Sequence, residues 1–234
     1  GTPEDATSTN SNGSSTKLAF QWKANGGTTS TNSDGDINTT VQVNDTAGFS
    51  IVLSSNGNTT ARELGHGLSA APAMVITRAR NRTENWRVGV KHYANHDGSY
   101  NLDTDAAFNN TSTLHTGTDS DTFGVGTDYS VNGDYNYVDY ILSEINGYIK
   151  FVQFAGNSAS SGTFVYCGFK PAFVLLKVGY ASAGADFSAS WNIFDNRRDG
   201  YNSITKRLVP NNNAADASSS TQAIDFLSNG FKLY

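Results

Sequence analysis

The sequence predicts an all-β protein built from antiparallel sheets. Short runs rich in β-branched and aromatic residues recur along the whole chain, and Asn-Gly or Asp-Gly pairs separate many of them. Such pairs favour the positive φ of two-residue hairpin turns. No window of a dozen residues keeps a helical period. A third observation is that one stretch of the sequence is repeated in similar form, which predicts two related units.

The predicted strands follow the apolar runs in chain order. Their lengths are typical of strands and too short for most helices. A chain of 234 residues is also long enough to bury a core without a disulfide. The strands are predicted at residues 50–53, 73–78, 85–92, 137–145, 150–154, 163–169, 172–178, 191–194 and 230–234.

The repeated line reads "GHGLSAAPAMVITR" at 65–78 and "YCGFKPAFVLLK" at 166–177. A single spacing aligns about thirty residues around it, which chance rarely produces. We therefore predict two tandem, related antiparallel β-sandwich units, at 48–146 and 147–234. The matched positions are Gly48 with Gly147, Pro72–Ile76 with Pro171–Leu175, Arg78 with Lys177 and, beyond loops of different length, Trp86 with Trp191 and "YSVNGDY" (129–135) with "FLSNGFK" (226–232).

The N-terminal segment, residues 1–26, resembles the end of such a unit. Asn12-Gly13 is followed by Leu18, Phe20 and Trp22 in strict alternation. Asn132-Gly133 is followed in the same way by Val138, Tyr140 and Leu142. Two outcomes stay open for residues 16–24: they close the sheet of the second unit within the chain, or they complete the sheet of a neighbouring unit. Residues 27–47 are predicted to be a linker with one short edge strand at Thr39–Val43.

Composition and charge exclude several classes of partner. The formal net charge is −5, and no cluster of Lys and Arg is longer than Arg197-Arg198, so we expect no nucleic-acid partner. No apolar run approaches 18 residues and the N-terminus lacks the pattern of a signal peptide, so no membrane insertion is expected. The single cysteine, Cys167, lies in "FVYCGF" and is predicted to be a small buried hydrophobe.

No motif for catalysis or cofactor binding is recognisable. His66, in "GHG", is predicted to have a turn or cross-strand role. His92 and His96 have a spacing that would bind a metal on a helix, but their segment has no helical period. The acidic stretches 32–38, 101–105 and 119–121 lack the pattern of an EF-hand loop and are interpreted as hydrated turns. We therefore expect no enzyme, no cofactor and no metal site.

The order of motifs resembles a known family. The elements "TAGFSIV", "GHGL", "NW", then "FVYCGF", "PAFVLLK", "WNIFDNRRDGYN" and finally "IDFLSNGFKL" are similar to the tandem β-domain of tail-fibre and virion-surface proteins of marine tailed phages, cyanophages especially. The resemblance extends from about Leu18 to Tyr234. It implies a place on the outer surface of the virion, with other virion proteins and further copies of the chain as partners, and it implies a trimer. It supplies no catalytic residues.

Aromatic side chains in loops are the candidates for recognition. Trp86 and Trp191 hold matched places in the two units and are predicted to pack in the core. The loops "HDGSY" and "RRDGY" are less alike, and they offer a carbohydrate- or receptor-binding surface made of Tyr93, His96, Asp97, Tyr100 and Tyr201. We expect a phage structural protein, a tail-fibre or adhesive segment that contacts a host surface glycan. The alternative is an architectural spacer or capsid-decorating module, and a third reading, a glycan depolymerase, is disfavoured because no suitable carboxylate pair is recognisable.

Overall fold

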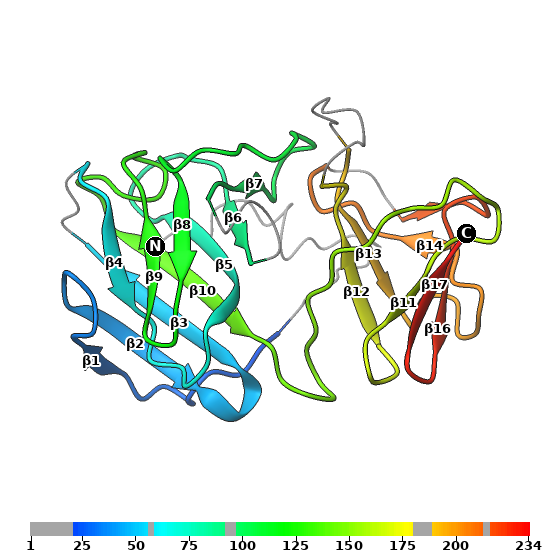
Figure 1. Ribbon diagram of the computed structural model, residues 1–234, viewed down its shortest axis with the longest axis horizontal. Coiled ribbons are helices and arrows are strands. Elements are labelled where there is room, and N and C mark those ends of the chain that lie inside the picture. The colour runs from blue at the N-terminus through cyan, green and yellow to red at the C-terminus, as the bar shows by residue number, and fades with distance from the viewer. Residues whose placement is uncertain (1–20, 56–58, 92–96, 180–188, 213–215) are drawn as a thin grey trace, which may run out of the picture.

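The computed structural model describes residues 21–55, 59–91, 97–179, 189–212 and 216–234 (Figure 1). Strands and turns make up this part of the chain, and its helical content is one 3-10 turn at Asp45–Ala47. The predicted all-β fold is therefore confirmed. No helix in the described ranges is long and apolar enough to cross a membrane.

The largest sheet has seven antiparallel strands in the order β1-β2-β3-β10-β5-β6-β7. β10 comes last in sequence but lies in the middle, where Tyr140 pairs with Ile51 on one side and Ile76 on the other. The two pairings join β10 to segments that precede it by 89 and 64 residues. The strands are β1 Ser30–Asn32, β2 Thr39–Asn44, β3 Phe49–Ser54, β5 Pro72–Ala79, β6 Arg87–Val90, β7 Tyr100–Asn101 and β10 Tyr137–Ser143.

A second, three-stranded sheet packs against one face of the large sheet. It consists of β4 (Arg62–Gly65), β9 (Thr122–Val125) and β8 (His115–Thr118), in that order. Apolar side chains from both sheets form one buried cluster, which makes this part of the chain a β-sandwich. The cluster contains Val41, Val52, Leu64, Leu68, Val75, Leu114, Phe123, Val125, Val131 and Ile141.

The predicted linker at 27–47 is part of this sandwich, so that prediction is wrong. The strand expected at Thr39–Val43 does form, as β2, but it lies between β1 and β3 rather than at the edge. Val41 is buried in the core cluster, and Thr39 Oγ1 donates a hydrogen bond to the carbonyl of Gly65. The segment was mistaken for a linker because only two of its residues, Thr39 and Val41, are buried, and most of the others are polar.

Alternation along β10 places polar groups inside the sandwich. Asp139 and Ile141 are buried between the sheets, whereas Val138, Tyr140 and Leu142 lie half-buried on the outer face. Val138, Tyr140 and Leu142 are the residues that resemble the N-terminal segment, so the resemblance concerns the outer face of β10. Most of the N-terminal segment, residues 1–20, lies outside the described residues, and residues 21–24 form no strand.

The second half of the chain, from residue 147 on, has its own core, and the residues before it are called the first half. Three small sheets form it, in the orders β11-β17-β16, β12-β13 and β14-β15. Its buried cluster contains Val165, Val174, Phe194, Ile204, Ile224, Phe226 and Phe231. The strands are β11 Phe164–Tyr166, β12 Phe173–Leu176, β13 Asn192–Asp195, β14 Lys206–Arg207, β15 Ala217–Ser218, β16 Ile224–Leu227 and β17 Gly230–Leu233.

Two details of the predicted second unit are wrong. No strand forms at 150–154, where only Phe154 packs against the core. Residues 226–232 form the β16–β17 hairpin, whereas residues 129–135, aligned with them, form turns. In the first half the hairpin in the corresponding place is β8–β9, since β9 pairs with β4 as β17 pairs with β11. The description of the halves as copies of one unit stays a prediction.

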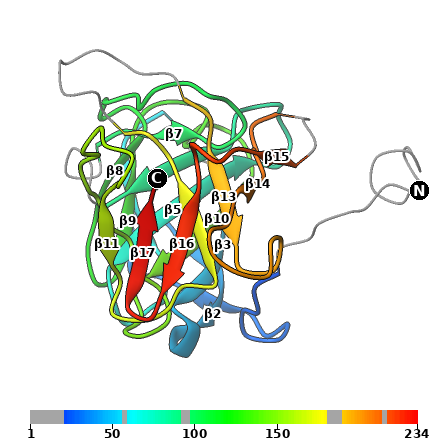
Figure 2. The ribbon, with the colours of Figure 1, turned by 90° about the vertical axis from the view of Figure 1, so that its right-hand side faces the viewer.

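The two halves lie side by side in Figure 1, and Figure 2 views them from the second half. They meet through a cluster of aromatic side chains. Trp191 from the second half packs against Tyr100 from the first, with ring centroids 5.6 Å apart. The indole Nε1 of Trp191 donates to the carbonyl of Asn101 at 2.7 Å. Lys177 Nζ donates to the carbonyl of Asp105 at 3.1 Å. The prediction of a core role is confirmed for Trp191, which is buried, while Trp86 is half-buried.

Candidate recognition loop

The loop between β13 and β14, residues 196–205, presents the most exposed of the large hydrophobic side chains in the described part of the chain. Tyr201 is 82% exposed, although it carries an aromatic ring. It follows Gly200, whose φ of +76° turns the chain at this point. An aromatic ring held in solvent by a turn is available to stack on a ligand.

Asp195, the last residue of β13, fixes the start of this loop. Its Oδ1 accepts hydrogen bonds from the amides of Arg197 and Arg198, at 3.0 and 3.1 Å. Its Oδ2 forms an ion pair with Nε of Arg198 at 2.6 Å. Nη1 of Arg198 in turn pairs with Asp216 at 2.6 Å. The largely buried Arg198 guanidinium thus ties the loop to the segment before β15.

Asp199 and Asn202 fix the rest of the loop. Asp199 Oδ2 accepts from the amides of Thr205, at 2.6 Å, and Lys206, at 2.9 Å. Burial alone would raise the pKa of Asp199, but these hydrogen bonds hold it below its ordinary value. The side chain of Asn202 pairs with both the carbonyl and the amide of Phe226 in β16. Tyr201 therefore extends from a loop that is braced on both sides.

The other predicted site residues do not join Tyr201. Tyr93 and His96 lie outside the described residues, and Asp97 is half-buried. Tyr100 is 4% exposed, so its assignment to a loop surface is wrong. Its ring begins β7 and is covered by Phe108 and Trp191 at the junction of the halves. Of the described site residues, Tyr201 is the one whose side chain is open to a ligand.

A buried polar network in the first sandwich was not predicted. Ser99 Oγ lies 2.6 Å from Nδ1 of His115, and Nε2 of His115 lies 2.8 Å from Thr77 Oγ1. Thr77 Oγ1 donates to Oδ1 of Asp139 at 2.5 Å. A threonine hydroxyl has one proton, so it must accept from Nε2–H of His115, which leaves Nδ1 to accept from Ser99 when the ring is neutral. All four side chains are buried, so the network acts on the stability of the fold rather than on a ligand.

The one sequence signal for this network is the acidic residue in "YVDYILS". A charged residue in an apolar strand is unusual, and burial here raises the pKa of Asp139 to about 7. Asp139 Oδ2 has no hydrogen-bond partner among the described residues. His115 and Ser99 lie in segments that sequence alone does not bring together.

His66 has the turn and cross-strand role that the sequence predicts. Its ring is fully buried, Nδ1 accepts from the amide of Leu68 at 3.1 Å, and Nε2 lies 3.4 Å from the carbonyl of Asp119. Burial lowers the pKa of His66. The thiol of Cys167 is half-buried against the second core, and burial raises its pKa, which disfavours a reactive thiolate.

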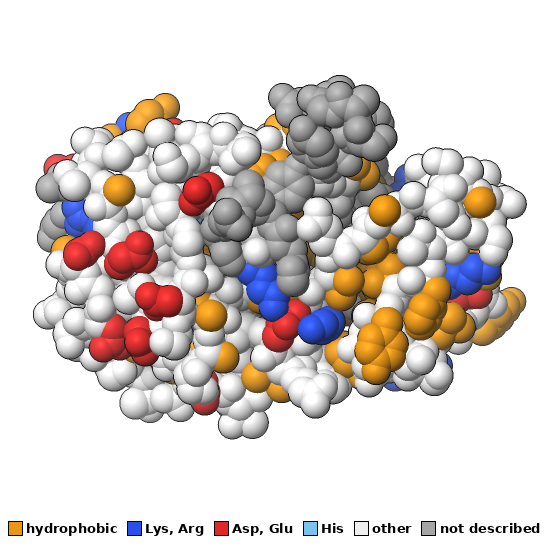
Figure 3. Space-filling view, viewed as in Figure 1, with side chains coloured by type: hydrophobic (Ala, Val, Ile, Leu, Met, Phe, Trp, Pro, Cys, Tyr) orange, Lys and Arg blue, Asp and Glu red, His pale blue; other side chains and the backbone are white. Residues whose placement is uncertain are grey.

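Two of the acidic stretches approach each other on the first half, where Figure 3 shows acidic side chains gathered. Burial raises the pKa of Glu63, and the charges of Asp119 and Asp36 raise it further. Asp119 also accepts hydrogen bonds from the amides of Asp121 and Thr122, as in a hydrated turn. Within the described ranges, no group of three or more His, Cys, Asp or Glu side chains is placed to hold a metal ion.

The fold and the loop define an all-β protein that presents a braced aromatic side chain at its surface. The chain belongs to the family described as Domain of unknown function (DUF7483), whose model matches residues 2–234. No curated protein and no solved structure matches it.

Proposed function

We propose that the protein is a structural component of a tailed-phage virion, a tail-fibre or adhesive segment that contacts the host surface through loops. The observation that carries this proposal is the braced presentation of Tyr201, which is 82% exposed. A loop that is already ordered loses little conformational entropy when it binds. The resemblance of the repeated motifs to tail-fibre proteins supports the same context, on the outside of the particle.

The chemistry of the loop suits a carbohydrate of the host surface. The ring of Tyr201 can stack on the apolar face of a sugar, and the exposed Arg197 side chain in the same loop can donate hydrogen bonds to hydroxyl groups. One such site binds weakly. Several copies on an oligomeric fibre would multiply the apparent affinity without any further contact.

A purely architectural role, as a spacer or capsid-decorating module, is the second candidate. It is favoured by the exposed apolar side chains of the second half, among them Phe164 and Tyr166. Such side chains suit a protein partner better than a sugar. In this role the chain would bind no glycan.

Binding of the full chain to an array of bacterial surface glycans separates the two candidates. The test compares the wild type with Tyr201→Ala and uses Tyr129→Ala as a matched control, because Tyr129 is a 49% exposed tyrosine of the first half. We expect at least tenfold weaker binding for Tyr201→Ala and unchanged binding for Tyr129→Ala. Absence of any glycan binding by the wild type, presented as a multivalent display, would favour the architectural role.

A further inference from the structure

Most charged side chains of the loop between β13 and β14, and of the strand ends beside it, are paired within the protein. Arg198 forms ion pairs with Asp195 and Asp216, each at 2.6 Å. Asp199 accepts hydrogen bonds from two backbone amides, and its Oδ1 lies 3.8 Å from Nζ of Lys206. Each of these charges is therefore offset by a neighbour of opposite sign.

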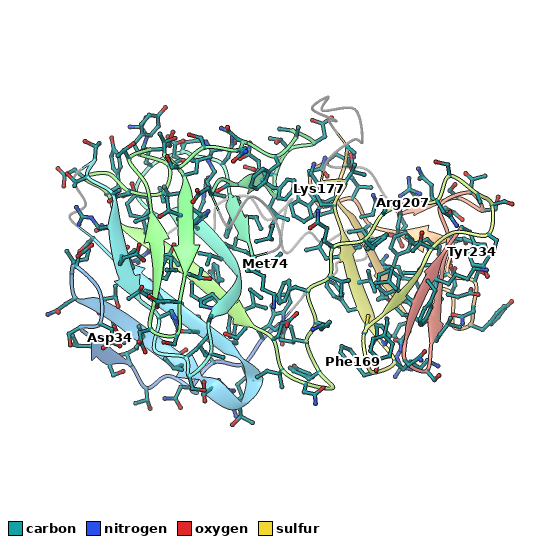
Figure 4. All side chains as sticks on the ribbon, in the orientation of Figure 1. Asp34, Met74, Phe169, Lys177, Arg207 and Tyr234 are labelled. Carbon is teal, nitrogen blue, oxygen red and sulfur yellow. The ribbon has the colours of Figure 1, made fainter. Side chains whose placement is uncertain are left out.

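Arg207 is not available to a ligand either. It is the last residue of β14, just beyond the loop, and it is labelled in Figure 4. Its Nε and Nη1 atoms have no hydrogen-bond partner among the described residues, but both atoms are buried. A ligand at the surface therefore cannot reach them.

Arg197 is the exception in this loop. Its backbone amide donates to Oδ1 of Asp195 at 3.0 Å, which fixes the main chain at this position. Its side chain is exposed, and no ion pair or hydrogen bond joins its guanidinium to any described residue. Arg197 thus presents a positive charge that the protein does not neutralise, together with its N–H donors, to whatever binds the loop.

The aromatic ring and the unpaired cation belong to one braced turn. Tyr201 follows Arg197 by four residues, so their Cα atoms lie within about 14 Å of each other, a span that a short oligosaccharide covers. The ring suits the apolar face of a sugar. The planar guanidinium matches a carboxylate, with which it can form two parallel hydrogen bonds. The pair of side chains therefore fits a sugar chain that carries carboxylates.

We propose that the loop recognises an acidic glycan of the uronic-acid class. Tyr201 stacks on a sugar ring, and the Arg197 guanidinium pairs with a carboxylate of the same or the next sugar. This inference rests on the proposed glycan-binding function and names the class of glycan. The chain has a net charge of −5 and so repels an acidic polymer as a whole. A preference for one must therefore come from a local contact.

The test starts from binding of the full chain, presented as a multivalent display, to an array of neutral and acidic bacterial surface glycans. The acidic glycan that binds most tightly is then compared with the same glycan after its carboxyl groups have been reduced to primary alcohols. This reduction removes the charge and keeps the sugar chain. Three variants are measured beside the wild type: Arg197→Gln, Arg197→Lys and, as the matched control, Lys170→Gln. Lys170 is an exposed cation elsewhere in the second half, so its substitution changes the net charge equally.

We expect the wild type to bind the acidic glycan at least tenfold more tightly than its reduced form. Arg197→Gln should lose this preference and bind the reduced form nearly as the wild type does. Arg197→Lys keeps the charge without the planar fork and should retain part of the preference. Lys170→Gln should bind like the wild type. Thermal melting checks that the variants fold, which is expected because the backbone contact of Arg197 with Asp195 does not involve the substituted side chain.

The outcomes separate this inference from the proposed function. A wild type that binds glycans through Tyr201 without preferring the acidic form overturns the inference and leaves the proposed function standing. A loss on Arg197→Gln substitution that is equal for both forms of the glycan, or that Lys170→Gln reproduces, also overturns it. Absence of binding to any glycan overturns both.

Discussion

The ammonium group of Lys177 lies 5.7 Å from the ring centroid of Trp191, and the guanidinium of Arg78 lies 5.6 Å from that of Trp86. The repeat in the sequence aligns Lys177 with Arg78 and Trp191 with Trp86. The two halves therefore place a cation over a matched indole ring in the same way. This contact supports the prediction of two related units. The two indole rings differ in burial. Trp191 is buried against the first half, whereas Trp86 is half-buried.

Trp191→Ala should destabilise the protein more than Trp86→Ala. Trp191 is buried among Tyr100 and Leu175 and donates a hydrogen bond to Asn101, so its truncation should cost about 3–5 kcal/mol. Trp86 is half-buried, and its truncation should cost about 1–2 kcal/mol. Urea denaturation of both variants measures the difference. Equal losses would contradict the position of Trp191 at the junction of the halves.

Asp139→Asn should remove a pH dependence of stability. Burial raises the pKa of Asp139 to about 7 from an ordinary 3.8, so the folded state keeps a proton that the unfolded chain releases above about pH 4. The stability gained from this proton is present at low pH and is lost as pH rises toward 7. The free energy of unfolding should fall by on the order of 2 kcal/mol between pH 5 and pH 7 from this group.

Urea denaturation across this pH range checks the contribution of Asp139. The curve of Asp139→Asn should be flatter than that of the wild type. The exposed Asp134 offers a matched control, and Asp134→Asn should follow the wild-type curve. If Asp139→Asn keeps the full wild-type slope, the buried carboxyl is not its source.

Gly89→Ala should destabilise the first sandwich through the ring of His115. A Cβ added at Gly89 would lie 2.9 Å from Cγ of His115, whose two nitrogens are held by Ser99 and Thr77. The ring cannot easily move, so the expected loss is about 1–3 kcal/mol. A Cβ added at Gly156 would meet no other atom within 4 Å, and Gly156→Ala is the control.

Removal of the ring tests this explanation in a double-mutant cycle. In a His115→Ala background, the Gly89→Ala substitution should cost much less than in the wild type, because the clash has gone. The measurement is again the free energy of unfolding. Additive losses in the double variant would show that Gly89 matters for a reason other than the ring.

Asp195→Asn should weaken glycan binding without unfolding the protein. The substitution removes the charge that holds Arg198 at the base of the Tyr201 loop. Tyr201 would then sample more orientations, and we expect roughly tenfold weaker binding with a melting temperature within a few degrees of the wild type. Asp216→Asn acts on the more exposed end of the same arginine and should have a smaller effect. Unchanged binding by Asp195→Asn would mean that the loop does not depend on this brace.

The strands of the repeated line could be predicted because their local signals agree. In β5 and β12, the runs of β-branched and apolar residues are short, which favours strand over helix. The position of β10 in the middle of the sheet could not be predicted, because its partners are distant in sequence. The strand at β2 was predicted, but its place inside the sheet, between β1 and β3, was not. Thr39 is buried through a hydrogen bond to Gly65 that no local pattern reveals.

The residues of the candidate site could also be predicted only in part. Tyr201 could be found because an Asp-Gly turn precedes it and no apolar run follows it. Tyr100 also follows Asp-Gly closely, but the second half covers it, and contacts between halves leave no local signal. The braces from Asp195 and Asn202 depend on the folded positions of Asp216 and Phe226. Their residue types are common in any loop, so the sequence did not single them out.

The most direct test of a place on the virion surface is immuno-electron microscopy of intact tailed-phage particles that carry this protein. An antibody raised against the purified chain marks where it lies. The proposed function predicts labelling of intact particles, concentrated on the tail fibres. Labelling that is absent from intact particles and confined to disrupted ones would contradict it.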